Sequence, residues 1–268
     1  MSIKKNNLKV ACIQTVAGSN FVQNLERAIA LAYESEQAKV DLIAFPEMFL
    51  YRGSPDLYPE IAHESNRVIH KFPHIAKLSG VSILLGSILE KSSQPKKYHN
   101  TSFFISRSGA ILSKYRKIHL FDVKTPNKTT VQESKWIAPG RSIVLSDDEG
   151  IRFGLSICFD LRFPNHYQAL VRRGAQVIFV PSNFLRETGR AHWHALLRAR
   201  AIENQAFVIA PAQAGANPDS GQKSFGHSMI VNPWGEVLAE AGGLRSEVVV
   251  ANLDLNSQLV LRRSFPVI

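Results

Sequence analysis

The sequence predicts an α/β protein built as a four-layer α-β-β-α sandwich of two mixed sheets with an internal pseudo-two-fold repeat. The first observation is that similar segments recur in the same order, so that "VDLIAFPEMFL" (40–50) resembles "AQVIFVPSNFL" (175–185). The second is that segments with helical spacing of apolar residues separate the strand-like runs. Each half therefore reads β-α-β-α-β-β-β, and two such halves bury their sheets face to face with helices outside.

The expected strands are short. Uniformly apolar runs such as "LIAF" and "VIFV" are typical of strands buried on both faces, and Ser-Gly and Trp-Gly pairs mark the turns of two hairpins. The segments that carry the repeat are 8–15, 40–50, 80–90 and the hairpin 100–112 in the first half, and 152–159, 175–185, 206–215 and the hairpin 226–238 in the second.

Helix-like segments lie between these strands. Asn20 is a plausible N-cap of the first helix, and Pro73 predicts a break or kink in the second. The polar residues 122–150, with two prolines and two glycines, are expected to form a loop that links the halves of one domain spanning 1–268. The expected helices are 20–38, 62–79, 165–173 and 191–204.

Composition narrows the function classes. The net charge of +10 comes from Lys and Arg residues that are scattered, without a basic arm or a zinc-finger spacing, so nucleic acid is not an expected partner. No apolar run approaches the roughly 18 residues of a membrane span. Two cysteines fit a reducing compartment, and no apolar segment follows the positively charged N-terminus. We therefore expect a cytoplasmic protein.

Three residues with useful chemistry follow expected strands: Glu47 after 40–45, Lys117 after the first hairpin, and Cys158 after 151–157. A thiol with a pKa of about 8.5 is only slightly ionised at pH 7. A neighbouring carboxylate would take its proton, and an ammonium group would stabilise an oxyanion. Read one at a time, the same residues also fit a core cysteine, a surface or capping acid and a solvated lysine.

Five motifs carry a resemblance to a known family: "FPEMFL", "YRKIHLFD", "CFDLRFP", "TGRAHWHALLRARAIENQ" and "FGHSMIVNPWGEVLAEAG". Together they resemble the nitrilase, or carbon–nitrogen hydrolase, superfamily over about residues 8–254. The stretch 158–243 most resembles the branch of omega-amidases and deaminated-glutathione amidases. The resemblance implies the same sandwich fold, a cofactor-free and metal-free reaction on a small-molecule amide, and a homodimer or larger homo-oligomer.

The resemblance also implies roles for individual residues. Glu47 would be the general base and Cys158 the acylated nucleophile. Lys117 would stabilise the oxyanion with help from the backbone N–H of Phe159, a position where the family usually has Tyr. Glu133, in "QESKWIAPG", would orient the lysine and the amine.

Substrate-binding residues are implied by the branch. Arg162 is expected to hold a substrate carboxylate through its guanidinium group, and Phe184 and Thr188 match positions that line the pocket. The residues alone leave open an ion pair of Arg162 with Asp160 or another acid. Asn165 replaces the glutamate that is usual in this branch.

Several residues resemble parts of other kinds of site, such as a metal site or a papain-type Cys–His site, but their spacing or context favours structural roles. His192 and His194 are two apart on a helix and so point to opposing sides, which argues against a metal pair. His119 or His227 would have to face the thiol in a papain-type site, and structural roles are expected instead. Cys12 lies within an apolar strand and is expected in the core. No G-x-S-x-G, P-loop or G-x-G-x-x-G motif is present.

The resulting hypothesis is an amidase that releases ammonia from a small linear amide bearing its own carboxylate. An omega-amide of a 2-oxo acid or deaminated glutathione fits this description. Two alternatives remain open in the sequence: the same fold acting on a nitrile or a carbamoyl amine, and a non-catalytic interaction scaffold.

Overall fold

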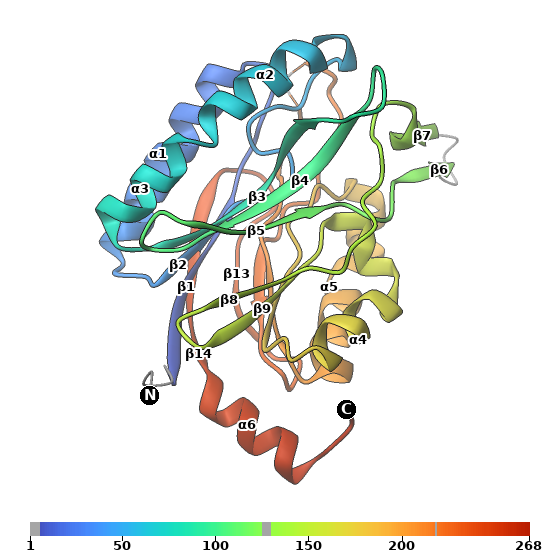
Figure 1. The fold of residues 1–268 in the computed structure, drawn as a ribbon. Coiled ribbons are helices and arrows are strands. Elements are labelled where there is room, and N and C mark those ends of the chain that lie inside the picture. The colour runs from blue at the N-terminus through green and yellow to red at the C-terminus, as the bar shows by residue number, and fades with distance from the viewer. Residues whose placement is uncertain (1–5, 125–129, 218) are drawn as a thin grey trace.

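Across residues 6–124, 130–217 and 219–268, which the computed structural model describes, two six-stranded mixed sheets pack against each other (Figure 1). The predicted fold class is confirmed. The first sheet has the order β14(Glu247–Asp254), β1(Asn7–Gln14), β2(Leu42–Ala44), β3(Ser82–Lys91), β4(Tyr98–Ile105), β5(Ile111–Arg116). The second has the order β13(Val237–Glu240), β12(Met229–Val231), β11(Phe207–Ala210), β10(Val177–Phe179), β9(Ile151–Leu155), β8(Leu145–Asp148).

The two sheets share one pairing scheme, which is the predicted repeat. In each sheet, three consecutive strands pair in parallel, β1-β2-β3 and β9-β10-β11. A hairpin then continues the sheet in antiparallel fashion, as β4-β5 and β12-β13. An antiparallel strand, β14 or β8, closes the other edge.

Helices cover the outer faces, so that α1, α2 and α3 lie on the first sheet and α4 and α5 on the second (Figure 1). The Asn20 side chain accepts a hydrogen bond from Gln23 N at 3.0 Å, as expected of an N-cap. The predicted break precedes Pro73, which sits in the first turn of α3, where a missing N–H costs nothing. The bounds are α1(Phe21–Gln37), α2(Tyr58–Val68), α3(Lys71–Ser79), α4(Pro164–Arg172) and α5(Arg186–Asn204).

Strand β1 shows how alternation builds the layers. Val10 and Cys12 belong to the core between the two sheets, whereas Ala11 and Ile13 pack under the helices of the first sheet. Successive side chains of a strand point to opposite faces, so one strand serves both cores. Full burial of the larger side chains, Val10 and Ile13, contributes about 1.5–3 kcal/mol each.

The prediction of a loop over 122–150 is wrong in part. The segment contains the small hairpin β6(Asp122–Lys124) and β7(Thr130–Gln132), the short 3-10 helix η2(Glu133–Lys135), and β8. Strand β8 lies at a sheet edge and is partly solvated, so it lacks the apolar signature of a buried strand. Two elements near the C-terminus, β14 and α6(Leu255–Ser264), were also not predicted.

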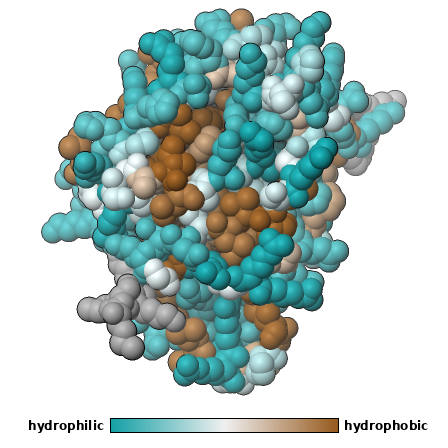
Figure 2. Space-filling model, viewed as in Figure 1, coloured by the Kyte–Doolittle hydropathy of each residue, from teal (hydrophilic) through white to brown (hydrophobic). Residues whose placement is uncertain are grey.

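Figure 2 shows mainly polar side chains on the face seen in Figure 1, with apolar side chains gathered in patches near its centre. Among the described residues, none of the helices is both long and apolar enough to span a bilayer.

Candidate active site

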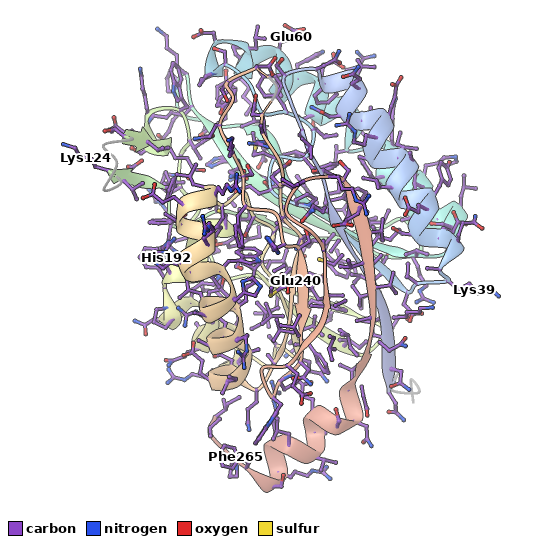
Figure 3. The ribbon with its side chains drawn as sticks, turned by 180° about the vertical axis from the view of Figure 1, so that it is seen from behind. Lys39, Glu60, Lys124, His192, Glu240 and Phe265 are labelled. Carbon is purple, nitrogen blue, oxygen red and sulfur yellow. The ribbon has the colours of Figure 1, made fainter. Side chains whose placement is uncertain are left out.

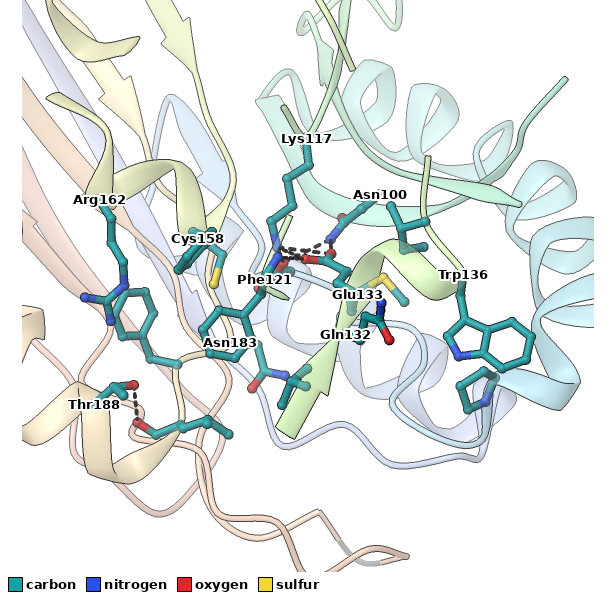
Figure 4. A pocket seen from close by; sticks show the side chains of 18 of the residues that line it. Asn100, Lys117, Phe121, Gln132, Glu133, Trp136, Cys158, Arg162, Asn183 and Thr188 are labelled. Atoms are coloured by element: carbon teal, nitrogen blue, oxygen red, sulfur yellow. Dashed lines mark hydrogen bonds and ion pairs between the residues drawn. The ribbon is translucent and has the colours of Figure 1, made fainter. Parts of the chain in front are cut away.

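Four side chains from separate elements line one cavity of about 400 Å³ (Figure 4). Glu47 follows β2 across Pro46, Lys117 directly follows β5, Glu133 opens η2, and Cys158 opens the 3-10 helix η3(Cys158–Arg162) after β9. A cavity of this size suits a small molecule. The fold therefore brings the acid, amine and thiol predicted from sequence into one place.

Lys117 is the centre of the polar cluster. Its Nζ lies 2.9 Å from Glu47 Oε1 and 2.9 Å from Glu133 Oε2, and its side chain is 2% exposed. Asn100 Nδ2 donates to Glu47 Oε1 at 2.9 Å and to Glu133 Oε1 at 3.3 Å. A buried charge is tolerated only when it is paired and hydrogen-bonded, so these contacts fix the positions of both carboxylates.

Cys158 occupies an unusual backbone conformation. Its φ is +47°, in the left-handed region that costs a residue other than glycine about 1–3 kcal/mol. The Cys158 N–H donates to Pro181 O at 2.9 Å, which ties the turn to the segment after β10. The turn lifts the thiol out of the strand and into the cavity, where Glu47 and Lys117 lie.

Asp160 holds this turn and the lysine segment together. Its carboxylate accepts from Ile157 N (2.8 Å), from the hydroxyl of Tyr115 (2.6 Å) and from the backbone N–H of His119 (3.0 Å). The alternative of an ion pair with Arg162 is wrong, because Asp160 faces away from it into this fully buried network. Asp160 therefore braces the turn that carries Cys158.

The charges of the cluster set the protonation of the site. Burial by itself would lower the pKa of Lys117. The Glu133 and Glu47 carboxylates outweigh burial, so the pKa of Lys117 lies well above its ordinary value. Burial and then Glu47 raise the pKa of the Cys158 thiol well above its usual range, and Lys117 opposes them only in part. At neutral pH the thiol therefore keeps its proton, and the Glu47 carboxylate lines the same cavity.

The predicted substrate-binding residues line the same cavity. The guanidinium carbon of Arg162 lies 5.2 Å from the ring centre of Phe184 and 5.9 Å from that of Phe159. Arg162 Nη1 is 3.2 Å from Nδ1 of His192, a residue on α5 (Figure 3). Thr188 lies one turn earlier on that helix. Among the described residues Arg162 forms no ion pair, so its charge is available to a ligand.

Two polar residues of the cavity were missed from the sequence. Asn100 belongs to β4, a strand that is buried along its whole length although it carries a polar run from His99 to Ser102. Buried polar groups need partners, so this run was an available signal. Asn183 also lines the cavity, beside Cys158 (Figure 4); it lies in "VPSNFL" and gave no comparable signal.

No histidine of the described residues lines the cavity, and His119, His194 and His227 have partners away from it. His119 Nδ1 lies 2.7 Å from Asp160 Oδ1, and both His194 and His227 contact Glu240 Oε1, at 2.9 and 2.7 Å (Figure 3 shows Glu240). Two groups of these side chains lie close enough to share a metal ion, although His166 in the first group has Nε2 3.2 Å from Leu155 O and Nδ1 without a hydrogen-bond partner among the described residues. The groups concerned are His119, Asp160 and His166, and His194, His227 and Glu240.

Comparisons with known proteins identify similar chains. The family model described as "Carbon-nitrogen hydrolase" matches residues 9–262. A deaminated glutathione amidase of Dictyostelium discoideum is 36% identical, over 99% of this chain and 94% of the relative. The omega-amidase NIT2 of Bos taurus is 36% identical, over 97% of this chain and 93% of the relative.

Solved structures give the same result. The C. elegans NitFhit protein superposes with a TM-score of 0.93 and 33% identity, over 99% of this chain and 65% of that longer chain. Saccharomyces cerevisiae Nit3, described as a member of branch 10 of the nitrilase superfamily, superposes with a TM-score of 0.87 and 30% identity, over 99% of this chain and 97% of that chain.

Proposed function

This chain belongs to the carbon–nitrogen hydrolase family, and we propose that it is an amidase in which Cys158 forms a thioester with the acyl group of a linear amide. The observation that carries the proposal is the contact of Lys117 Nζ with both Glu47 and Glu133 in the cavity that holds Cys158.

In the first half of the reaction, Cys158 Sγ attacks the amide carbonyl carbon while Glu47 takes the thiol proton. Lys117 and the N–H of Phe159, which lies in the first turn of η3, stabilise the oxyanion. Collapse of the tetrahedral intermediate breaks the C–N bond, and the proton on Glu47 passes to the leaving nitrogen to give ammonia.

In the second half, Glu47 takes a proton from a water molecule, which attacks the thioester. The C–S bond breaks, the thiol regains its proton, and a carboxylic acid leaves. Glu133 holds Lys117 in place throughout, since both of its carboxylate oxygens contact the ammonium group.

The substrate class follows from Arg162. A cationic group without an acidic partner at the cavity wall, flanked by two aromatic rings, suits a small amide that bears a carboxylate. The names of the D. discoideum and B. taurus relatives point to deaminated glutathione and to omega-amides as candidates. No cofactor is invoked, and a cytoplasmic homodimer or larger homo-oligomer remains a prediction.

The test is ammonia release from carboxylated amides and from neutral amides of the same length, with nitriles and carbamoyl amines in the same screen. The Arg162→Ala substitution is expected to raise KM for carboxylated amides about tenfold to a hundredfold, because a hydrogen bond to a charged group contributes a binding free energy of that size. KM for neutral amides should change little. Arg162→Lys, which keeps the charge, should lie between. Equal KM values for Arg162→Ala and the parent protein on carboxylated amides would mean that Arg162 does not bind the substrate carboxylate.

A further inference from the structure

A buried arginine behind the cavity has few partners. Arg52 is 7% exposed, and its Nη2 donates to Ser224 Oγ at 2.8 Å, whereas its Nη1 is buried without a hydrogen-bond partner. No ion pair of Arg52 is found within the described residues. Burying a cation with only one neutral hydrogen-bond partner costs free energy of folding. A buried polar group that lacks partners therefore calls for an explanation, such as a functional role.

The Arg52 contact fixes the direction of a hydrogen-bond chain. A guanidinium group only donates, so Ser224 Oγ is the acceptor of that bond. The single hydroxyl proton of Ser224 is then free to donate, and it does so to Asn183 Oδ1 at 2.7 Å. The oxygen of the Asn183 amide therefore faces Ser224, and its NH₂ group is directed away from Ser224.

Asn183 lines the same cavity as the reacting sulfur of Cys158 (Figure 4). The backbone of Asn183 acts to lower the pKa of the Cys158 thiol. Within the described residues its Nδ2 has no hydrogen-bond partner. An acyl group bonded to the sulfur would therefore share the cavity with an amide group whose orientation is already set.

We infer that Asn183 is a substrate-binding residue whose Nδ2 donates to a carbonyl or carboxylate oxygen on the acyl chain of the substrate, and that Arg52 and Ser224 are its positioning residues. This inference rests on the proposed function and narrows it. It predicts that the cavity prefers amides with a second oxygen-bearing group over apolar amides of equal length.

The charge of Arg52 works in the same direction. Burial lowers the pKa of Arg52 to about 10, with Glu47 opposing the shift, so the side chain is still a cation at neutral pH. A positive charge at the end of the chain polarises the hydroxyl and the amide in series and strengthens the donor that faces the cavity.

The test uses binding, because binding does not depend on turnover. In a Cys158→Ala background, calorimetry would measure the dissociation constants of succinamate and of butyramide, which has the same chain length without the carboxylate. Asn183→Leu keeps the size of the side chain but removes the donor. We expect it to weaken succinamate binding about tenfold or more, as for other hydrogen bonds to charged groups, and to leave butyramide within about twofold.

The positioning role has its own variants. Ser224→Ala and Arg52→Met should reproduce part of the selective loss for succinamate, and Arg52→Lys should restore part of it. Thermal unfolding of each variant would separate misfolding from lost recognition. If the Ser224 and Arg52 variants bind succinamate as the parent does, the positioning part of the inference is wrong.

Other outcomes are also decisive. If Asn183→Leu weakens the binding of succinamate and butyramide equally, Asn183 has a structural or oxyanion role and the inference is overturned. The inference is also overturned if Asn183→Leu does not weaken succinamate binding, or if the parent background does not prefer succinamate to butyramide. Selective binding without ammonia release by the protein that retains Cys158 would instead contradict the proposed function and leave this inference standing.

Discussion

The two cysteines occupy buried positions in the two halves of the repeat and differ in almost everything else. Cys12 is 0% exposed and Cys158 8% exposed, and burial raises the pKa of both thiols. Cys12 lies inside β1, paired on one side with β2 and on the other with β14, and its thiol donates a hydrogen bond to Met229 O at 3.8 Å. Cys158 lies beyond the end of β9, in a turn that opens into the cavity.

The difference shows that burial by itself does not make a thiol a nucleophile. Both thiols keep their protons at neutral pH, so neither is activated in the resting protein. Only Cys158 has a carboxylate placed to take the proton and an ammonium group placed to stabilise the product of attack. Three experiments break or sharpen this comparison.

The largest effect is expected from removing each sulfur in turn. Cys158→Ala should lower kcat by about 10⁴-fold or more, as for other nucleophile deletions, and leave the fold intact. Cys12→Ala should keep its activity and lose about 1 kcal/mol of unfolding free energy through a small core cavity. Ammonia release and urea unfolding measure the two quantities. Comparable activity in the two variants would mean that Cys158 is not the nucleophile.

A smaller effect is expected from loosening the turn that presents Cys158. Asp160→Asn removes the charge that accepts from Tyr115, His119 and Ile157, and should cost about 3 kcal/mol of unfolding free energy. Activity should fall with it, since the turn and the lysine segment lose their common anchor. Asp147→Asn is the matched control, because Asp147 pairs with Arg152 at the surface and should cost less than about 1 kcal/mol.

Acid titration adds a second readout for Asp160. Burial raises the pKa of Asp160, but bonds from His119 and other donors outweigh it, so the net pKa lies below its ordinary value of 3.8. A depressed pKa contributes stability that is present above the unfolded value and is lost as the pH falls through the folded value. Asp160→Asn should therefore flatten the acid limb of the stability curve. If the unfolding free energy of Asp160→Asn falls with decreasing pH as steeply as that of the parent protein, the buried Asp160 carboxylate does not contribute to the acid dependence of stability.

The smallest effect lies on the alkaline side. Burial raises the pKa of both thiols above their unfolded value of 9.0. A raised pKa contributes stability that is complete below the unfolded value and is lost as the pH rises above it. Unfolding free energy should therefore decline above pH 9, and each cysteine-to-alanine variant should decline less steeply. Identical slopes in all three proteins, measured by urea unfolding from pH 8 to 10.5, would contradict the assignment of buried protonated thiols.

The sequence predicted the parts of the site that lie at strand ends. Glu47 and Cys158 follow apolar runs whose period and length identify buried strands, and parallel strands present their carboxyl ends at one edge of a sheet. Glu133 was placed by resemblance alone, because its surroundings in 122–150 gave the pattern of a loop. There β8 and the β6-β7 hairpin are short, polar and partly exposed, so alternation and hydropathy carry little information.

What the sequence determined by itself is the set of strands and helices that carry the repeat, without β8, β14 and α6, together with the repeat itself and the residues with reactive groups. These follow from local properties: the periodicity of apolar residues, capping side chains and turn residues. What only the tertiary structure decided is which polar atoms meet. The Arg52–Ser224–Asn183 chain consists of hydrogen bonds between residues 172 and 41 positions apart, and the partner of Arg162 is a histidine 30 residues away rather than the neighbouring Asp160. A change of a few tenths of an ångström in the distance between donor and acceptor decides whether a hydrogen bond forms. These distances are set by how whole sheets pack, not by the order of residues along the chain.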